Sequence, residues 1–328
     1  MEIHLNSSEE KIRSSFNGHK NPSKRNEMDL ETFKFFLNLL VVDQSDTLVA
    51  LSGIEPLENP YIKDILNLTN GYVNDFDFHC AIWTNGVNIY KYINDYPQFT
   101  RFNINIKSPQ ILEEKWDELI FSLDKLQERG FMAKRVQGVR SYRDVIGVTL
   151  GCALIEEVTD YSYFFELLDK YGLREARVCI SLPSSKQDKD SYFIKMKPIF
   201  LDFIQKAWER DIPLIYECNN IPPCYFESRE LFLASVYNCN GIRAMGWCPR
   251  VFQVMPDRTV QLCPCIKETS KEKILNFQNL KDVGNKMFDL RKQIEEKKYM
   301  PKCENCILKS VKMCFGGCLG FEGDDNNE

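Results

Sequence analysis

The feature that most constrains the fold is an alternation of strand-like and helix-like segments through the first 215 residues. Short apolar or alternating runs favour strands, and apolar residues that recur every three or four positions favour helices. Strands are predicted at residues 2–5, 47–51, 76–82, 102–106, 145–150, 176–182 and 213–216. Helices are predicted to begin at Asp29 and to cover residues 60–68, 112–126, 161–168 and 199–207.

Repeated strand–helix units indicate parallel βαβ connections, and therefore an α/β fold. Six or seven such units favour a complete or partial (β/α) barrel over a six-stranded open sheet. In barrels of this kind the functional residues lie at the carboxyl ends of the strands. Here those ends are predicted at residues 52–56, 84–86, 107–108, 151 and 181–183.

After residue 217 the alternation stops and cysteines accumulate. Ten of the 13 cysteines lie between Cys218 and Cys318, whereas Cys80, Cys152 and Cys179 stand singly in apolar surroundings, as small buried residues do. A hairpin is predicted from 251–254 and 260–262, and a helix over 285–296. The sequence thus predicts a barrel domain at 1–217, a cysteine-rich domain at 218–320 and a disordered acidic tail at 321–328.

The N-terminus has no apolar signal region, and no run approaches the ~18 apolar residues of a membrane helix. We therefore expect a cytoplasmic protein that does not enter membranes. The net charge of −5, without a long basic run, argues against a nucleic-acid partner. In a reducing compartment, clustered cysteines bind metal rather than form disulfides. Ten thiols suit iron–sulfur clusters better than zinc, although zinc, which needs about four, stays an alternative.

The spacing of the last cysteines resembles a known domain. Cys248 and Cys263 are followed by Cys303-x2-Cys306 and by Cys314-x3-Cys318, which encloses two glycines. This pattern is similar to the SPASM domain, the C-terminal extension of many radical S-adenosylmethionine (radical SAM) enzymes, particularly those that modify ribosomally made peptides. Arg258 stands where the pattern often has glycine, and the spacer before Cys314 is two residues longer than usual.

The resemblance implies two auxiliary [4Fe–4S] clusters. The first would be held by Cys239, Cys248, Cys263 and Cys318, and the second by Cys303, Cys306 and Cys314. The family supplies the last ligand from beyond the final Cys-x3-Cys, but no cysteine follows Cys318. Cys265, Cys218 or Cys224 could take that place, and otherwise the second cluster has an open site or is absent.

The barrel segment resembles the same family. Residues 52–57, Ser-Gly-Ile-Glu-Pro-Leu, are similar to the radical SAM GGEP motif, with Ile54 in place of the second glycine. The resemblance implies that Gly53 and Glu55 form a vestigial SAM loop. Asn59-Pro60 and the ending 84–86, Thr-Asn-Gly, also match the family. The alternative role for Glu55 is to accept hydrogen bonds from backbone N–H groups of its own loop.

The motif that defines radical SAM enzymes, Cys-x3-Cys-x2-Cys before an aromatic residue, is missing. With Phe16 as the aromatic residue, Ser8, Ile12 and Ser15 occupy the cysteine positions, and no cysteine precedes Cys80. A frame shifted by two residues gives Glu10, Ser14 and Asn17. Without thiolates a cubane cluster cannot be held, so binding of SAM is doubtful and no catalytic residue is assigned.

Three functions fit this sequence. The leading hypothesis is an inactive or non-canonical radical-SAM-like protein that binds a peptide or a partner maturase during peptide maturation. The second is an iron–sulfur enzyme that uses an auxiliary cluster with an open site. The third is a zinc-stabilised binding module.

Overall fold

Two units make up the chain in the computed structural model, which describes residues 2–7, 26–43, 48–76, 78–97, 100–132, 147–182, 188–217, 221–236, 252–263, 266, 272–297, 300–311, 314, 316 and 318. Unit 1 comprises Met1–Thr149, Val251–Pro264 and Thr269–Leu290. Unit 2 comprises Leu150–Arg250, Cys265–Glu268 and Arg291–Glu328.

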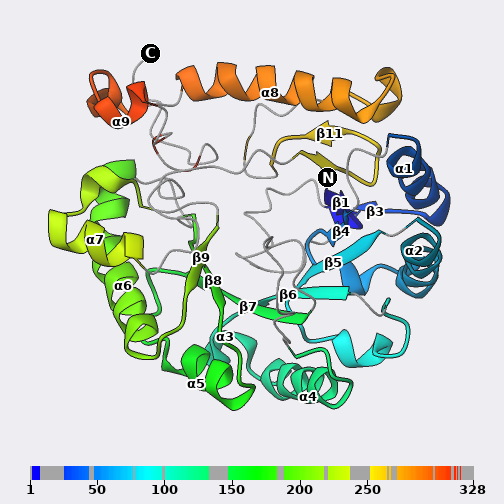
Figure 1. Cartoon of the computed structure of the whole chain (residues 1–328), viewed down its shortest axis with the longest axis horizontal. Helices are drawn as coiled ribbons and strands as arrows, with labels where there is room; N and C mark the ends of the chain where they lie inside the picture. Colours follow the sequence, from blue (N-terminus) through cyan, green and yellow to red (C-terminus); the bar gives the residue numbers. More distant parts are fainter. Residues whose placement is uncertain are drawn as a thin grey trace. The chain divides into compact units, whose positions relative to one another are not determined.

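The main sheet is mostly parallel and has the strand order β11-β10-β1-β4-β5-β6-β7-β8-β9 (Figure 1). Its strands are β1 (Glu2–His4), β4 (Leu48–Ser52), β5 (His79–Thr84), β6 (Thr100–Ile106), β7 (Gly147–Leu154), β8 (Ala176–Ile180), β9 (Leu214–Tyr216), β10 (Gln253–Val254) and β11 (Val260–Gln261). A separate pair joins β2 (Asn6–Ser7) and β3 (Asn26–Glu27). The predicted α/β class, consistent with a partial (β/α) barrel, is confirmed.

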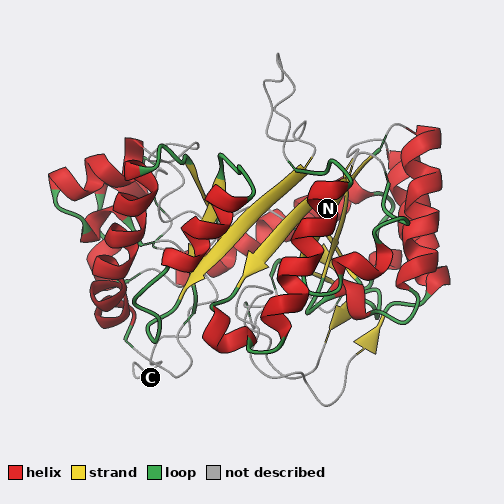
Figure 2. Ribbon diagram, turned by 90° about the horizontal axis from the view of Figure 1, so that it is seen from below, coloured by secondary structure: helices red, strands yellow, loops and turns green. Residues whose placement is uncertain are grey.

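Helices alternate with these strands along the chain. Figure 2 shows the helices in red and the strands in yellow. They are α1 (Leu30–Asp43), α2 (Ile62–Phe76), α3 (Pro109–Leu112), α4 (Lys115–Glu128), α5 (Ser162–Lys170), α6 (Lys189–Glu209), α7 (Ser228–Val236), α8 (Leu280–Lys297) and α9 (Ile307–Ser310). Short 3-10 turns are η2 (Pro56–Glu58), η3 (Ile89–Tyr92), η5 (Pro223–Tyr225), η7 (Ile274–Asn276) and η8 (Pro301–Cys303). None of these described helices has the length and apolar content needed to span a bilayer.

Four predicted elements differ from the structure. Phe76 ends helix α2 instead of starting a strand, so α2 is longer and β5 shorter than expected. The helix expected at 112–126 breaks at Glu113, whose φ of 49° is left-handed. Helix α6 begins at Lys189, because Asp188 caps it by accepting the Ser191 N–H, and it continues through Pro198. Helix α7 was not predicted at all.

The two faces of the sheet in unit 1 differ in chemistry. Ile104 of β6 points to the helix side, since a methyl on Gly86 would meet both Ile104 and Leu119 of α4. Successive residues of a strand point to opposite faces, so Arg101, Asn103 and Asn105 face away from the helices, and all three are buried. The face of β6 turned away from the helices is thus polar and inaccessible to bulk water.

Unit 2 has a packed aromatic core. Phe203 of α6 contacts the rings of Phe164 and Phe165 of α5, and Phe200 contacts Tyr216 of β9. On the opposite face of the strands, Arg177 is fully buried and its Nη1 lies 2.6 Å from Glu217 Oε1. Because a buried charge needs a partner, this ion pair holds β8 to the end of β9.

The predicted hairpin is present as β10 and β11, which pair antiparallel. It belongs to unit 1, where β10 also pairs parallel with β1, matching Glu2 with Gln253. The hairpin therefore extends the main sheet beyond β1. The domain limits predicted at 217/218 and 320/321 stay predictions.

Candidate functional site

The loop after β4 is organised around the carboxylate of Glu55, which is 3% exposed. Its Oε1 accepts hydrogen bonds from the Leu57 N–H at 3.2 Å and from the Thr84 hydroxyl at 2.7 Å. Its Oε2 accepts the Asn85 N–H at 2.7 Å. Glu55 therefore caps η2 within its own loop and joins the end of β4 to the end of β5. The arrangement is that of the loop-stabilising acceptor expected as the alternative role.

The residues around Glu55 explain the local sequence. Gly53 has a φ of 139° and Gly86 a φ of 86°, a region that favours glycine. The Thr84 hydroxyl accepts the Gly86 N–H at 3.0 Å, and the Asn85 side chain accepts the Val87 N–H at 2.9 Å. The segment 84–86 that the family resemblance singled out thus builds the turn that receives the Glu55 carboxylate.

Asn59 connects the same loop by hydrogen bonds to the end of the first strand. Its side-chain amide donates to the Leu5 carbonyl at 2.8 Å and to the Met28 carbonyl at 3.2 Å. Its oxygen accepts the Tyr61 N–H at 2.8 Å. Asn59, which the family resemblance singled out, therefore joins the loop after β4 to the residues that follow β1 and β3.

Burial controls the electrostatics of this loop. It raises the pKa of Glu55 to about 7, although the hydrogen bonds from Asn85, Thr84 and Leu57 act in the opposite direction. Burial also lowers the pKa of Lys107, while the nearby Glu55 charge acts to raise it. A carboxyl group and an amine at the ends of β4 and β6 are thus both destabilised in their charged forms.

Buried polar atoms at the same strand ends lack a hydrogen-bond partner among the described residues. They are Ser52 Oγ at the end of β4, Asn103 Oδ1 in β6 and Ser108 Oγ just after β6. An unmet buried polar group is unfavourable and is usually satisfied by water or a ligand. These atoms make the strand ends of unit 1 suited to a polar ligand.

The positions that would carry the SAM-cleaving cluster, Ser8, Ile12 and Ser15, lie outside the described residues, as do Glu10, Ser14 and Asn17. So do four of the C-terminal cysteines, namely Cys218, Cys239, Cys248 and Cys265. Cys263 follows β11 in unit 1 and is half-buried. Cys80, Cys152 and Cys179 are buried, as predicted.

The described cysteines of unit 2 lie on tight turns. Cys303 ends η8, and the Cys306 N–H donates to the Cys303 carbonyl at 3.3 Å before α9 begins. The Cys314 N–H donates to the Leu308 carbonyl at 3.1 Å. The Gly316 N–H lies 3.4 Å from Cys314 Sγ, and Gly316 has a φ of 75°. Glycine at this left-handed position thus lets the backbone N–H approach the sulfur.

In this arrangement no three His, Cys, Asp or Glu side chains of the described ranges are close enough to hold a metal ion. Cys303, Cys306, Cys314 and Cys318 all belong to unit 2, and thiolates are the ligands that thiophilic metals prefer. The ligand assignments made from the sequence remain predictions.

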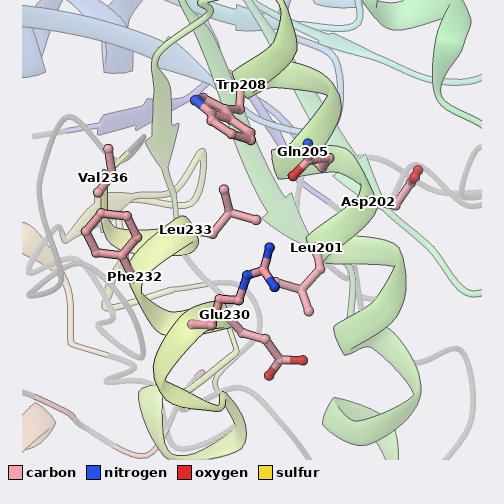
Figure 3. Close-up of a pocket in the computed structure, with 9 residues that line it drawn as sticks. Leu201, Asp202, Gln205, Trp208, Glu230, Phe232, Leu233 and Val236 are labelled. Carbon is pink, nitrogen blue, oxygen red and sulfur yellow. The ribbon is translucent and has the colours of Figure 1, made fainter.

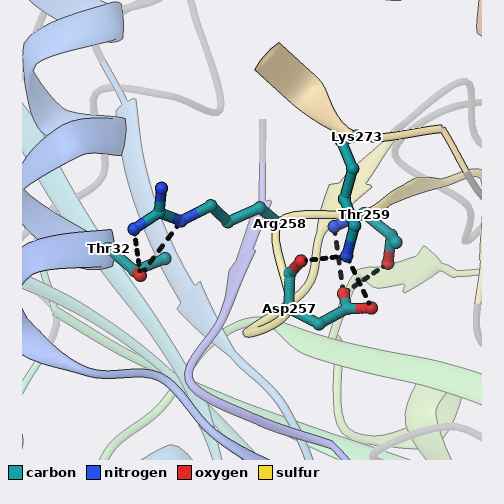
Figure 4. Close-up of polar contacts among 5 residues, drawn as sticks. All are labelled: Thr32, Asp257, Arg258, Thr259 and Lys273. Atoms are coloured by element: carbon teal, nitrogen blue, oxygen red, sulfur yellow. Dashed lines mark hydrogen bonds and ion pairs between the residues drawn. The ribbon is translucent and has the colours of Figure 1, made fainter. Parts of the chain in front are cut away.

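Arg258, at the position where the SPASM pattern often has glycine, lies in the turn between β10 and β11. Its φ of 66° is left-handed, which is the conformation that glycine would favour. Figure 4 shows its guanidinium reaching Thr32 of α1, to whose hydroxyl Nε and Nη2 donate at 3.2 and 3.0 Å. The guanidinium also lies 5.6 Å from the ring centroid of Phe35. Arg258 therefore adopts the left-handed backbone conformation that a glycine at this position would favour.

An apolar groove of about 500 Å³ lies between α6 and α7 in unit 2 (Figure 3). Its lining combines the apolar Leu201, Leu233 and Trp208 with the polar or charged Asp202, Gln205, Arg229 and Glu230. Phe232 and Val236, also in the lining, are 68% and 54% exposed. Exposed apolar side chains beside a groove are typical of a surface that binds another molecule.

Comparisons with known proteins inform on the fold. No family model matches the chain, and no curated protein matches its sequence. Among solved structures, the chain is similar to Streptococcus suis SuiB, described in its complex with the precursor peptide SuiA. The TM-score is 0.57 at 15% identity, over 97% of this chain and 71% of that chain. This likeness supports the predicted α/β fold of partial (β/α) barrel type.

Proposed function

We propose that this chain is a radical-SAM-like protein that acts in the maturation of a ribosomally made peptide by binding the peptide or a partner maturase. On this proposal it does not cleave SAM itself. The observation that carries the proposal is the Glu55 carboxylate, whose oxygens already accept hydrogen bonds from Leu57, Thr84 and Asn85. A carboxylate engaged in this way has little capacity left for a ligand's amino group.

Two further facts support this function. No cysteine precedes Cys80, so the chain lacks the thiolates that hold a SAM-cleaving cluster. The likeness to SuiB, which was studied with its precursor peptide, favours a role in peptide maturation. The α6–α7 groove, with its exposed Phe232, is one surface suited to apolar side chains of such a peptide.

We assign the C-terminal cysteines to one or two auxiliary [4Fe–4S] clusters, with zinc as the alternative. A bound centre would supply cross-links between the turns around Cys303 and Cys314, or would relay electrons. The turns themselves present the sulfur atoms, and the Gly316 N–H donates to one of them. No step of peptide chemistry is assigned to these residues.

The test is reductive cleavage of SAM. The full chain is reconstituted anaerobically with iron and sulfide and reduced with dithionite, and 5′-deoxyadenosine is measured beside an intact radical SAM enzyme. We expect none from this chain, and we expect Glu55→Ala to alter stability without altering SAM binding measured by calorimetry. Formation of 5′-deoxyadenosine that is lost in Glu55→Ala would overturn the proposal.

A further inference from the structure

Helix α7 is held in place against helix α6 and strand β9 of unit 2. The Tyr216 hydroxyl of β9 donates a hydrogen bond to the Ala234 carbonyl of α7 at 2.7 Å. Lys197 Nζ of α6 lies 3.0 Å from Glu230 Oε2 of α7. The groove between the two helices is therefore formed by elements that are already positioned, as ligand sites usually are.

The lining of the groove follows one face of each helix. On α6 the lining side chains recur after four and then three residues, and on α7 after three, one and three residues, which is the spacing of neighbours on a helix surface. They are Leu201, Gln205 and Trp208 on α6 and Arg229, Phe232, Leu233 and Val236 on α7 (Figure 3). Each face extends over about two helical turns, or about 10 Å. A third helix of about two turns, laid along the groove, would contact both faces.

The apolar part of the lining is open to solvent. Trp208, Phe232 and Val236 are all exposed, and Ala234 is the one residue of α7 recorded as buried within the described range of that helix. Covering large apolar side chains with other apolar groups removes them from water and is the main favourable term in association. The groove is therefore suited to a ligand with apolar side chains.

The charged residues of the lining differ in whether their charge is paired. Asp202 Oδ2 lies 3.0 Å from Lys206 Nζ, and Glu230 is paired with Lys197. Arg229, in contrast, is exposed and has no ion pair or hydrogen bond with any residue in the part of the chain that the structure describes. The uncompensated charge of the lining is thus a single guanidinium. A carboxylate complements it, and a second cation would be repelled.

The size of the groove favours a short segment over a folded partner. Nine residues line it, whereas a stable interface between two folded proteins involves about 20–30 residues on each side. A second copy of this chain or a folded maturase would thus need much more surface than the groove offers. Its volume of about 500 Å³ lies in the range of pockets that bind small ligands. The occupant that fits is a short peptide segment.

We propose that this groove binds a helical segment of the ribosomally made peptide, whose apolar side chains pack on Phe232 and Leu233 and whose carboxylate pairs with Arg229. The inference rests on the proposed function, and it takes the peptide rather than a partner maturase as the occupant. It adds the chemistry of recognition: apolar residues at helical spacing with Asp or Glu beside them. A segment with Lys or Arg at those positions is rejected by Arg229.

The experiment measures the fluorescence anisotropy of two labelled synthetic probes titrated with the full chain at low salt. Both probes are Ala-based helices of about 16 residues with Leu at every third or fourth position, and they carry either Glu or Lys beside the leucines. The wild type is compared with Arg229→Glu and with Arg174→Glu. Arg174 is an exposed arginine of unit 2 outside the lining, so its replacement changes the net charge equally and leaves the groove intact.

We expect the wild type to bind the acidic probe about fivefold more tightly than the basic probe, since Arg229 attracts one and repels the other. Arg229→Glu should reverse this preference, and Arg174→Glu should retain it. The acidic probe should also shift the tryptophan emission to shorter wavelength, and Trp208→Phe should abolish that shift because Trp208 lines the groove. Circular dichroism checks that each variant is folded, which we expect for a change at the exposed Arg229.

The inference fails if the wild type binds neither probe, if it binds both equally, or if Arg174→Glu changes the preference as much as Arg229→Glu does. It also fails if sedimentation shows a wild-type dimer that Phe232→Ser converts to a monomer, because a second copy would then occupy the groove. None of these results decides whether SAM is cleaved, which the 5′-deoxyadenosine measurement tests separately. Conversely, SAM cleavage by the wild type would refute the proposed function and leave the measured preference for an acidic helix intact.

Discussion

Replacement of Glu55 by glutamine tests the electrostatics of the loop after β4. The buried carboxyl has a pKa of about 7 in the folded chain, against 4.5 as its ordinary value, because burial outweighs three hydrogen bonds. Glutamine is nearly the same size and cannot ionise. Any constant packing effect of the substitution is the same at every pH, so the dependence on pH isolates the carboxyl group.

The sign follows from the direction of the pKa change. A folded state with the higher pKa holds the proton more tightly than the unfolded state does. The Glu55 contribution to the free energy of unfolding therefore falls as pH rises from about 4.5 to about 7, and is constant above that range. At about 1.4 kcal/mol per pH unit, the total change is about 3 kcal/mol.

Urea unfolding at a series of pH values from 4.5 to 8 measures this difference. Relative to Glu55→Gln, the wild type should lose about 3 kcal/mol across the window. Thr84→Val removes one donor to the carboxylate, so it should raise the pKa of Glu55 further and extend the loss to higher pH. Parallel curves for wild type and Glu55→Gln, or a wild type that gains stability with pH, would refute the reasoning, since the hydrogen bonds would then outweigh burial.

Arg258→Ala should lower the free energy of unfolding by about 2 kcal/mol, since the hydrogen bonds to Thr32 and the contact with Phe35 are lost. Arg258→Gly loses the same contacts but relieves the left-handed backbone, so it should cost only about 1 kcal/mol, and a glycine variant less stable than the alanine variant would contradict this. Gly316→Ala should at least halve the bound metal measured by mass spectrometry, whereas Gly284→Ala, which has open space at its Cβ, should not. Phe232→Ser should leave thermal unfolding unchanged and weaken, by about tenfold, the affinity for a labelled candidate precursor peptide measured by fluorescence anisotropy, and equal affinities would exclude the groove.

The alternation of strands and helices could be predicted because the residues that bury against one another are periodic. The clearest error is the predicted start of helix α6. The helix predicted over residues 199–207 in fact begins at Lys189 and continues through Pro198. The Asp188 cap, three residues before Ser191, was the signal that could have located it. Helix α7 was not predicted, because it lacks a periodic buried face: only Ala234 is buried, whereas Phe232 and Val236 are exposed.

The candidate site was predictable in its residues but not in its contacts. Gly53 and Glu55 were singled out from the sequence, but the partners Thr84 and Asn85 lie on the next strand, and only the fold brings them to the carboxylate. In the same way, spacing alone left Cys218, Cys224 and Cys265 equivalent. Cys218 and Cys265 lie outside the described residues, so all three stay predictions.

Arg258 and Ile12 illustrate two kinds of departure from a family pattern. At Arg258 the pattern requires a left-handed backbone, which glycine adopts freely and another residue can adopt at a cost of about 1 kcal/mol. Here the hydrogen bonds to Thr32 offset that cost, so the missing glycine does not weaken the resemblance. At Ile12 the pattern requires a thiolate, and a hydrocarbon side chain has no atom that can bind iron. A conformational requirement can be met by other residues, but a ligand requirement cannot, and this is why the function we propose keeps the fold and the cysteine-rich segment without the cleavage of SAM.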